Sequence, residues 1–325
     1  MTRYKQLCGV VRTATVLLLI VTLTLSNART SFAATAQDTE TTLSVNGVSR
    51  AYLLHVPPSS LVTGTPVPLV LVLHGVSGDG ADVAIAQLTN MNATADQYGF
   101  AVAYPNARTL PNCAFPCTKW DIENAAGSND VAFIIALIDA LVQRGVADTN
   151  HVYVAGFSNG GDFAHELACE HPGRIMGIAA VGANLPKSVA ASCVGMDMGS
   201  AVSMLAINGT EDTTQGQRVE GSLNRSWNGT RDFWLARNHC DPAMVTESAL
   251  PNTDPLDGTT ATARIWSCAM GQAVEQIIVQ GGGHAWPGSA EPDAEKATCT
   301  EHSTCISQDF SANAVIWQFF AALTR

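Results

Sequence analysis

The sequence is poor in charged residues, which make up 14% of its 325 residues, whereas 46% are hydrophobic. Disordered proteins show the opposite balance, so this composition indicates a packed globule. Basic residues are especially few, with 17 Lys and Arg against 28 Asp and Glu and a net charge of −11. This negative charge argues against nucleic acid or an anionic membrane as the main partner.

Hydrophobic runs long enough to cross a membrane are also missing. The most apolar stretch, residues 13–25, is shorter than the about 20 residues that a helix needs to cross a bilayer. Basic residues precede it and small residues follow it, an order typical of a cleavable export signal. The flanking residues are Arg3, Lys5 and Arg12 before it, and Ala33, Ala34 and Ala36 after it. We therefore expect a signal peptide at residues 1–36, a mature domain at 37–325 and a secreted protein. Cleavage after Ala28 or Ala34, or an uncleaved anchor, is the alternative.

Cysteine usage agrees with export. Cys8 lies in the expected signal, which leaves an even number of cysteines, and an even count in an exported chain indicates disulfides. The spacing alone cannot fix the connectivity. Proximity in the sequence favours Cys113–Cys117, Cys169–Cys193, Cys240–Cys268 and Cys299–Cys305. A metal site at Cys299-x-x-His302-x-x-Cys305 is the alternative, but no fourth ligand is evident, so we expect no metal.

Apolar runs alternate with amphipathic stretches along the chain. The run at residues 69–73 is continuously apolar, as in strands buried on both faces of a parallel sheet. Residues 130–143 place their apolar side chains on one helical face, with Ser128 or Asn129 available as a cap. Strands are expected at 42–48, 50–56, 69–75, 100–104, 151–155, 178–181, 202–207, 262–267 and 273–279. Helices are expected at 81–98, 130–143, 162–168, 227–237 and 311–323, and the rest of 213–260 is expected to be irregular. This alternation predicts an α/β fold with a doubly wound, mostly parallel sheet in a single domain.

The most informative motif is Gly156-Phe157-Ser158-Asn159-Gly160. It lies between the apolar run 151–155 and a segment in which Phe163 and Leu167 share one helical face. A serine between glycines at such a junction is typical of a nucleophile elbow, a turn so tight that only small neighbours avoid collision. The five-residue pattern also occurs by chance, so its context between strand and helix carries the prediction that Ser158 is a nucleophile.

A serine nucleophile needs a base and an acid, which follow it in the order Ser, Asp or Glu, His on this architecture. The best acid is Asp212, in the loop after the strand that ends near Asn208. Loops at that edge build the sites of open α/β sheets. Glu211 is the nearest competitor, and a turn-forming aspartate is the non-catalytic alternative.

The expected base is His284, which follows three glycines after the strand 273–279. His239 and His302 also lie downstream, but neither follows an apolar strand. His284 would take the proton of Ser158, and the acid would fix its tautomer and stabilise the imidazolium. An ordinary surface turn is the alternative for this glycine-rich segment.

Two main-chain N–H groups are expected to form the oxyanion hole. Val76 follows the strand that ends in His74-Gly75, and Asn159 follows the nucleophile, the two places from which this architecture supplies its donors. His74 itself is expected to be structural. Trp286 lies two residues after His284, which favours a contact with substrate, although most tryptophans pack in the core.

Four motifs together resemble one protein family. They are Leu73-His74-Gly75, Gly156-Phe157-Ser158-Asn159-Gly160-Gly161, Asn208-Gly209-Thr210-Glu211-Asp212 and Gly282-Gly283-His284-Ala285-Trp286-Pro287-Gly288. In this order, over residues 40–323, the chain resembles the secreted esterases of the poly(3-hydroxybutyrate) depolymerase and feruloyl esterase family. The resemblance implies the α/β-hydrolase fold, serine hydrolysis of carboxylic esters outside the cell, and no cofactor. The family's triad positions correspond to Ser158, Asp212 and His284.

The resemblance and the motifs give one functional expectation with two alternatives. We expect a secreted serine carboxylesterase that resembles polyhydroxybutyrate depolymerases and hydrolyses poly- or oligo-3-hydroxyalkanoate esters through an acyl-enzyme. The first alternative is a feruloyl or acetylxylan esterase that acts on plant polysaccharide esters. The second is a non-catalytic secreted binding protein on the same fold. The expected partner is an ester substrate, with no nucleic acid, membrane, metal or cofactor, and the expected state is a monomer.

Overall fold

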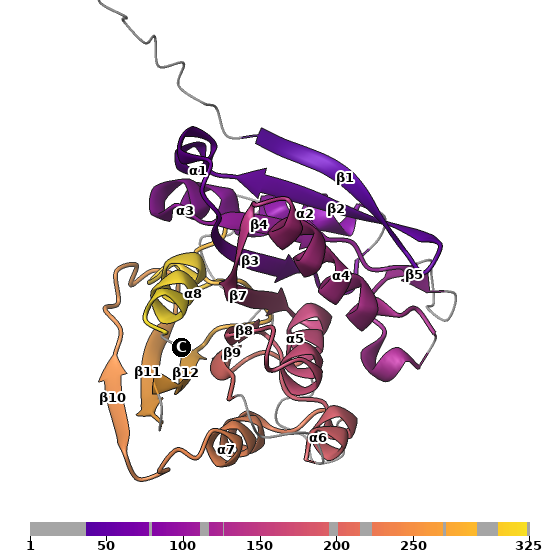
Figure 1. Cartoon of the computed structure of the whole chain (residues 1–325). Helices are drawn as coiled ribbons and strands as arrows, with labels where there is room; N and C mark the ends of the chain where they lie inside the picture. Colours follow the sequence, from indigo (N-terminus) through magenta and orange to yellow (C-terminus); the bar gives the residue numbers. More distant parts are fainter. Residues whose placement is uncertain are drawn as a thin grey trace, which may run out of the picture. The chain divides into compact units, whose positions relative to one another are not determined.

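A ten-stranded sheet forms the centre of the computed structural model, in the order β1-β2-β4-β3-β7-β8-β9-β12-β11-β10 (Figure 1). The structure describes residues 37–77, 80–110, 117–125, 127–194, 201–214, 223–268, 271–290 and 305–323. The main strands are β1 (Gln37–Val45), β2 (Val48–Val56), β3 (Val67–Leu73), β4 (Ala101–Pro105), β7 (Ala147–Phe157), β8 (Gly177–Val181), β9 (Ser203–Gly209), β10 (Val245–Ala249), β11 (Thr260–Ser267) and β12 (Ala273–Gln280). A separate two-stranded sheet pairs β5 (Thr109–Leu110) with β6 (Cys117–Thr118).

The six strands from β4 to β12 in the middle of the sheet are parallel, and an antiparallel pair flanks them on each side. This arrangement confirms the predicted α/β fold with a mostly parallel sheet. The first pair is the expected hairpin: Val45 pairs with Val48, and Asn46 and Gly47 between them have φ of 50° and 78°, as a two-residue turn of type I′ requires.

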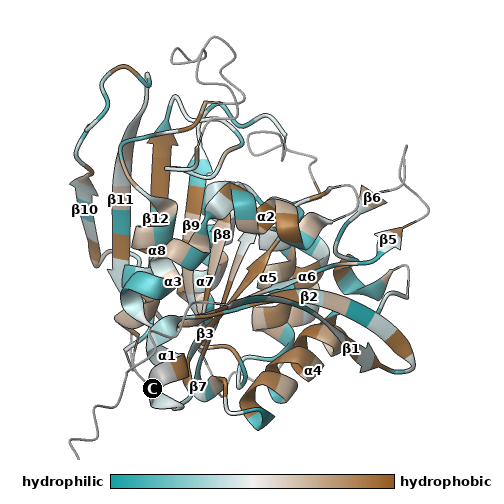
Figure 2. Cartoon of the chain, turned by 90° about the horizontal axis from the view of Figure 1, so that it is seen from above, coloured by the Kyte–Doolittle hydropathy of each residue, from teal (hydrophilic) through white to brown (hydrophobic). Residues whose placement is uncertain are grey.

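Helices cover both faces of the sheet, as the clusters of buried side chains show. The helices are α1 (Pro58–Thr63), α2 (Ala81–Thr89), α3 (Met91–Tyr98), α4 (Asp130–Gln143), α5 (Asn159–Glu170), α6 (Lys187–Cys193), α7 (Trp227–Arg237) and α8 (Ala312–Ala321), with a 3₁₀ turn at Ile122–Asn124. One cluster holds side chains of α4, α5, α6 and α7, and the other holds side chains of α2, α3 and α8. Figure 2 shows the hydrophobic central strands between these helices.

The central strands read as unbroken apolar runs because they are buried on both faces. In β3, Leu69, Leu71 and Leu73 belong to one cluster, whereas Val70 and Val72 belong to the other. Successive side chains of a strand point to opposite faces, so a strand between two helical layers needs apolar residues at every position.

Four parts of the predicted pattern were wrong. The expected helix 81–98 is two helices, since Asn90 between them has φ 47°. The region 213–260 contains β10, a polar edge strand whose five residues are all exposed and which therefore has no hydrophobic periodicity. The short helices α1 and α6 and the small β5–β6 sheet were also not predicted. Asn129 occupies the position before α4, but its side chain makes no capping hydrogen bond.

Disulfides join segments on one side of the sheet. Cys169 in α5 is bonded to Cys193 at the end of α6, and Cys240 is bonded to Cys268, as predicted. Cys117 and Cys305 are disulfide-bonded too. The expected partners Cys113 and Cys299, the histidine of the alternative metal site, His302, and the expected signal peptide lie outside the described residues. Among the helices of the described residues, none combines the length and the apolar character that crossing a membrane requires.

Candidate active site

Ser158 occupies the turn between β7 and α5, with φ 54° and ψ −125°. This backbone conformation is strained for any residue except glycine and is common at functional sites. The turn is held so closely that a Cβ atom on Gly156 would collide with the carbonyl of Gly160, and one on Gly160 would collide with the carbonyl of Leu73. Both glycines are therefore required, and the geometry is that of a nucleophile elbow.

The main chain of Ser158 is fixed on both sides. Its N–H donates to the Val181 carbonyl at 2.9 Å, and its carbonyl accepts from the N–H groups of Gly161 and Asp162 at 2.9 and 3.0 Å. The loop after β3 passes beside it, because a Cβ atom on Gly75 would lie 3.1 Å from the Cβ of Ser158. Val76, the next residue, is half exposed. The structure thus places Asn159, and the loop that leads through Gly75 to Val76, next to the serine.

Asp212 and His284 lie on neighbouring loops, which follow β9 and β12. The Nδ1 of His284 and the Oδ2 of Asp212 form a hydrogen bond of 2.7 Å. Asp212 is buried, and its Oδ1 accepts from the N–H of Thr214 at 2.9 Å. The loops are bonded to each other, since the Glu211 N–H donates to the Gly282 carbonyl at 2.8 Å.

His284 also lies next to the elbow. Its ring packs against Phe157, the residue before Ser158, with ring centroids 4.8 Å apart. It also rests on Gly182, where a Cβ atom would lie 3.1 Å from its Nδ1. Gly182 follows Val181, whose carbonyl holds the Ser158 N–H. The structure therefore brings the predicted acid and base together next to the elbow that carries Ser158, at the carboxyl ends of β7, β8, β9 and β12.

His74 is held by main-chain groups through both ring nitrogens. Its Nδ1 donates to the Gly75 carbonyl at 2.6 Å, and its Nε2 accepts from the Ala107 N–H at 3.0 Å. Burial lowers its pKa, which keeps the ring neutral. This arrangement agrees with the structural role expected for His74.

Sequence analysis missed the segment around Trp120, which braces the elbow. The side chain of Asn159 accepts from the Trp120 N–H at 2.7 Å and donates to the Trp120 carbonyl at 3.3 Å. The indole N–H of Trp120 donates to the His74 carbonyl at 2.9 Å, and its ring stacks on Phe163 in α5. The local sequence carries no signal for this contact, because the partners are about forty residues apart.

Trp286 lies in the core. It is 1% exposed, its indole N–H donates to the Oδ1 of Asn313 at 2.9 Å, and its ring meets that of Phe157 edge-on. This environment favours packing, and a direct contact between Trp286 and substrate stays a prediction.

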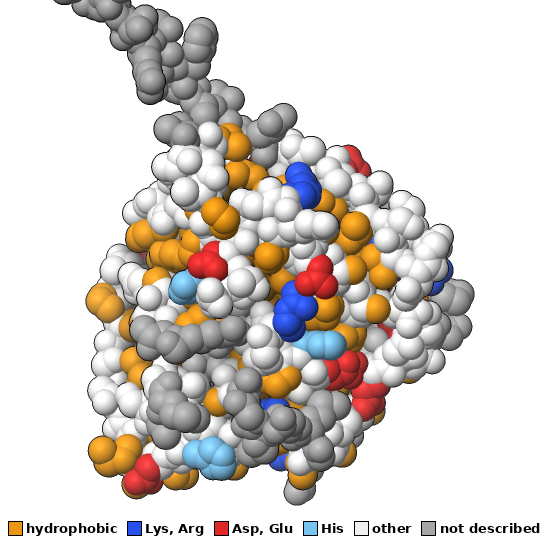
Figure 3. Space-filling model, viewed as in Figure 1, with side chains coloured by type: hydrophobic (Ala, Val, Ile, Leu, Met, Phe, Trp, Pro, Cys, Tyr) orange, Lys and Arg blue, Asp and Glu red, His pale blue; other side chains and the backbone are white. Residues whose placement is uncertain are grey.

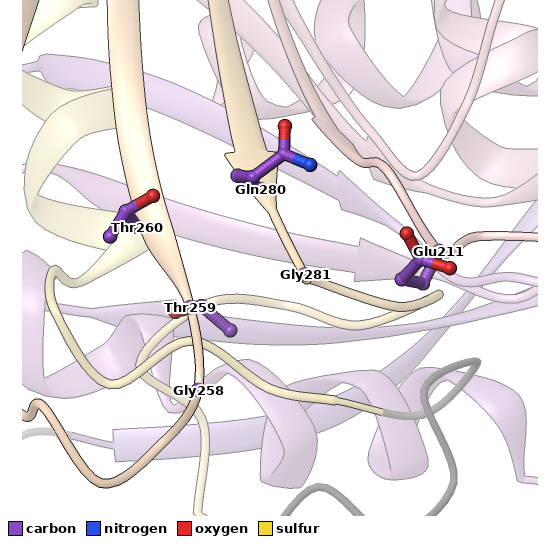
Figure 4. A pocket seen from close by; sticks show the side chains of 6 residues that line it. All are labelled: Glu211, Gly258, Thr259, Thr260, Gln280 and Gly281. Carbon is purple, nitrogen blue, oxygen red and sulfur yellow. The ribbon is translucent and has the colours of Figure 1, made fainter.

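A polar cavity of about 440 Å³ lies beside the loops that carry Asp212 and His284. Its lining residues are Glu211, Gly258, Thr259, Thr260, Gln280 and Gly281 (Figure 4). Figure 4 shows the Glu211 carboxylate and the Gln280 amide on neighbouring segments of the chain. Glu211, Thr259, Thr260 and Gln280 bring polar groups to its wall, which also exposes apolar atoms.

The chain is similar to known esterases in sequence and in structure. The family model described as "Esterase PHB depolymerase" matches residues 50–219. The chain is 32% identical over 269 residues to the putative esterase NocK of Nocardia uniformis subsp. tsuyamanensis, covering 76% of this chain and 74% of that protein. It is 28% identical over 291 residues to the poly(3-hydroxybutyrate) depolymerase of Ralstonia pickettii, covering 79% of this chain and 56% of that protein. Among solved structures, an acetyl xylan esterase from Aspergillus awamori superposes with a TM-score of 0.57 at 16% identity, covering 87% of this chain and 99% of that one. This likeness in structure confirms the α/β-hydrolase fold.

Proposed function

Because the chain belongs to the PHB depolymerase family of esterases, we propose that it is a secreted serine carboxylesterase whose catalytic triad is Ser158, His284 and Asp212. The observation that carries the proposal is the 2.7 Å hydrogen bond between His284 and Asp212 beside a strained serine elbow. A triad of this kind makes an otherwise weak hydroxyl nucleophilic.

The reaction passes through an acyl-enzyme. Ser158 Oγ attacks the ester carbonyl while His284 Nε2 takes its proton, and the tetrahedral intermediate collapses as His284 returns that proton to the departing alcohol. Water then attacks the acyl-serine with His284 as base, which releases the acid and restores the hydroxyl. Asp212 on Nδ1 holds the ring in the tautomer that leaves Nε2 free to accept the serine proton.

The negative charge on the carbonyl oxygen would be met by the main-chain N–H groups of Val76 and Asn159. Asn159 is the first residue of α5, so its N–H lies at the positive end of the helix dipole. Loss of one such donor typically costs about 100-fold or more in rate. The side-chain clamp between Asn159 and Trp120 supports this assignment, since it fixes the first turn of the helix.

For the substrate we propose esters of 3-hydroxyalkanoic acids, as in the relative from Ralstonia pickettii. The alternative is a feruloyl or acetyl ester of a plant polysaccharide, and the polar cavity beside the triad favours it. A sugar chain could place hydroxyls against Glu211, Gln280 and Thr260, whereas a polyhydroxyalkanoate chain has few hydroxyls to offer. Gln280→Ala should then lower turnover of acetylated xylan and leave hydroxybutyrate oligomers unaffected.

We also propose that the protein is exported and acts as a monomer. The disulfides support an oxidising location outside the cytoplasm. Figure 3 shows basic side chains as separate spots rather than a patch on the visible face, which supports a small ester rather than nucleic acid as partner.

Ser158→Ala tests the serine mechanism. We expect this variant to keep its circular dichroism spectrum but to lose hydrolysis of short-chain p-nitrophenyl esters and labelling by an organophosphate. Ser188→Ala, at an exposed position on α6, is the matched control and should retain both. Unchanged turnover in Ser158→Ala would refute the triad. An inert wild-type protein on hydroxybutyrate oligomers, methyl ferulate and acetylated xylan would favour a non-catalytic binding protein.

A further inference from the structure

A second buried carboxyl group, that of Asp162, lies one helical turn after the nucleophile. The main-chain N–H of Asp162 donates to the Ser158 carbonyl at 3.0 Å, which fixes the position of Asp162 relative to the elbow. Its Oδ1 accepts two hydrogen bonds, from the Asn184 N–H at 3.1 Å and from the Asn224 amide at 3.0 Å. The residue is only 8% exposed. Asp162 therefore connects the elbow helix to the loop after β8.

That loop is the surface on which the base rests. Gly182 lies directly against the His284 ring, and its N–H donates to the Ile207 carbonyl at 2.9 Å. The Asn208 amide donates to the Ala183 carbonyl at 3.2 Å. The segment 182–184 is thus hydrogen-bonded to β9 and to Asp162, and the imidazole of His284 packs against it. A movement of the Asp162 side chain would therefore displace residues 182–184 and, through them, the His284 ring.

The charge of Asp162 also acts on the site. Burial raises its pKa to about 7, against the hydrogen bonds from Asn224 and Asn184 and the attraction of His284. Two carboxyl groups thus act on His284: Asp212 from the loop after β9 through a hydrogen bond, and Asp162 from α5 through electrostatic attraction.

We propose that Asp162 is a positioning residue of the reaction: its carboxylate holds segment 182–184 against His284, and its negative charge stabilises the imidazolium that forms when Ser158 loses its proton. This inference rests on the proposed function. Asp162 takes no part in proton transfer, because the proton moves from Ser158 Oγ to His284 Nε2 and back to the leaving alcohol. Its effect is electrostatic and is largest when the ring is charged, which is the condition for lowering the barrier.

Asp162→Asn separates charge from geometry. The amide oxygen can still accept from Asn184 and Asn224, so the loop stays in place while the charge is lost. We expect kcat to fall on the order of tenfold, less than for loss of an oxyanion donor, with KM little changed. The loss should grow with pH, because a pKa of about 7 leaves Asp162 largely neutral in the wild type well below pH 7 and negatively charged above it. The two proteins should therefore have similar kcat at low pH, and the wild type should gain over the variant as the pH rises through 7.

The rate of organophosphate labelling of Ser158 against pH gives a second readout that does not depend on the natural substrate. It should show the same pH-dependent difference between the wild type and Asp162→Asn. Glu170→Gln, in the last turn of the same helix, is the matched control and should reproduce the wild-type profile. A circular dichroism spectrum like that of the wild type and a cooperative melting transition would show that the variant is folded.

A ratio of the wild-type rate to the Asp162→Asn rate that stays constant as the pH rises through 7, in both turnover and labelling, would overturn the proposal whatever the size of that ratio. Failure of the proposed function would look different: the wild type itself would be inert, or its turnover would survive Ser158→Ala. In that case His284 does not activate Ser158, and the role proposed for Asp162 would be refuted together with the proposed function.

Discussion

The carboxyl edge of the central strands and the outer strand β10 belong to one sheet but are packed in opposite ways. At the carboxyl edge, backbone touches backbone, as between Gly156 and Gly160, and polar groups such as Asp212 are buried and hydrogen-bonded. In β10 all five residues are exposed, and the strand pairs only with β11. The difference shows which positions tolerate substitution. Positions that orient the reacting groups should tolerate few substitutions, whereas positions that only extend the sheet should tolerate many.

The largest effect should come from Asp212→Asn at the carboxyl edge. The amide can no longer hold the imidazole in its working tautomer or stabilise its charge, so kcat should fall by about 10⁴-fold with the fold intact. Glu211→Gln, one residue away, is the matched control and should change kcat for p-nitrophenyl esters by less than about threefold. Equal losses in the two variants would move the acid role away from Asp212.

Gly160→Ala should break the elbow itself. The new methyl group would meet the Leu73 and His74 carbonyls, and moving the main chain costs about 3 kcal/mol of unfolding free energy. Urea unfolding measures this loss, and esterase activity should fall with it. Gly173→Ala is the control, since a Cβ atom there meets nothing within 4 Å. A stable, active Gly160→Ala protein would show that the edge is less rigid than its contacts indicate.

Asp162 gives a pH-dependent effect on stability. Its pKa is raised from 3.8 to about 7 in the folded protein, so its favourable contribution is full below about pH 4 and is lost as the pH rises through 7. Asp162→Asn should therefore be more stable than the wild type at pH 8, by on the order of a few kcal/mol of unfolding free energy, and should melt at a higher temperature. This difference in stability should shrink as the pH falls toward 4. Thermal melts at the two pH values measure this, and a gain that is independent of pH would contradict it.

The smallest effect is expected in the outer strand. Glu247 in β10 pairs with Arg264 in β11 at 2.7 Å, but 54% of the Glu247 side chain and 38% of the Arg264 side chain are exposed to water. Glu247→Gln should change the unfolding free energy by about 0.5 kcal/mol or less and leave kcat unchanged. Differential denaturation against the wild type measures this, and a loss as large as that of Gly160→Ala would end the contrast between the two regions.

The parts that sequence predicted are those with local signals. Continuous apolar runs marked the central strands, and the order of serine, acid and base along the chain led to Asp212 and His284, which the structure brings into hydrogen-bond contact. Strand β10 has no such signal, because a polar edge strand needs no apolar face. Asn90 splits the helix 81–98 through a positive φ that hydrophobicity does not encode.

The parts of the site that sequence missed depend on distant partners. Asp162 lies in α5, one turn from the serine, and that position was the available hint. Its role, however, comes from Asn184, Asn224 and His284. Likewise, Asn159 was expected to act through its main chain, while its side chain grips Trp120. Residues far apart in the sequence leave no periodic pattern that would pair them.

The bond between Glu211 and Gly282 joins the acid loop to the base loop, and Gly209 is pressed against Gly282 beneath it. The two loops therefore behave as one unit, so a substitution that moves one loop would also move the catalytic side chain on the other. Laboratory evolution toward new esters should therefore leave this unit untouched and accumulate its changes in the walls around it, beginning with the half-exposed Val76.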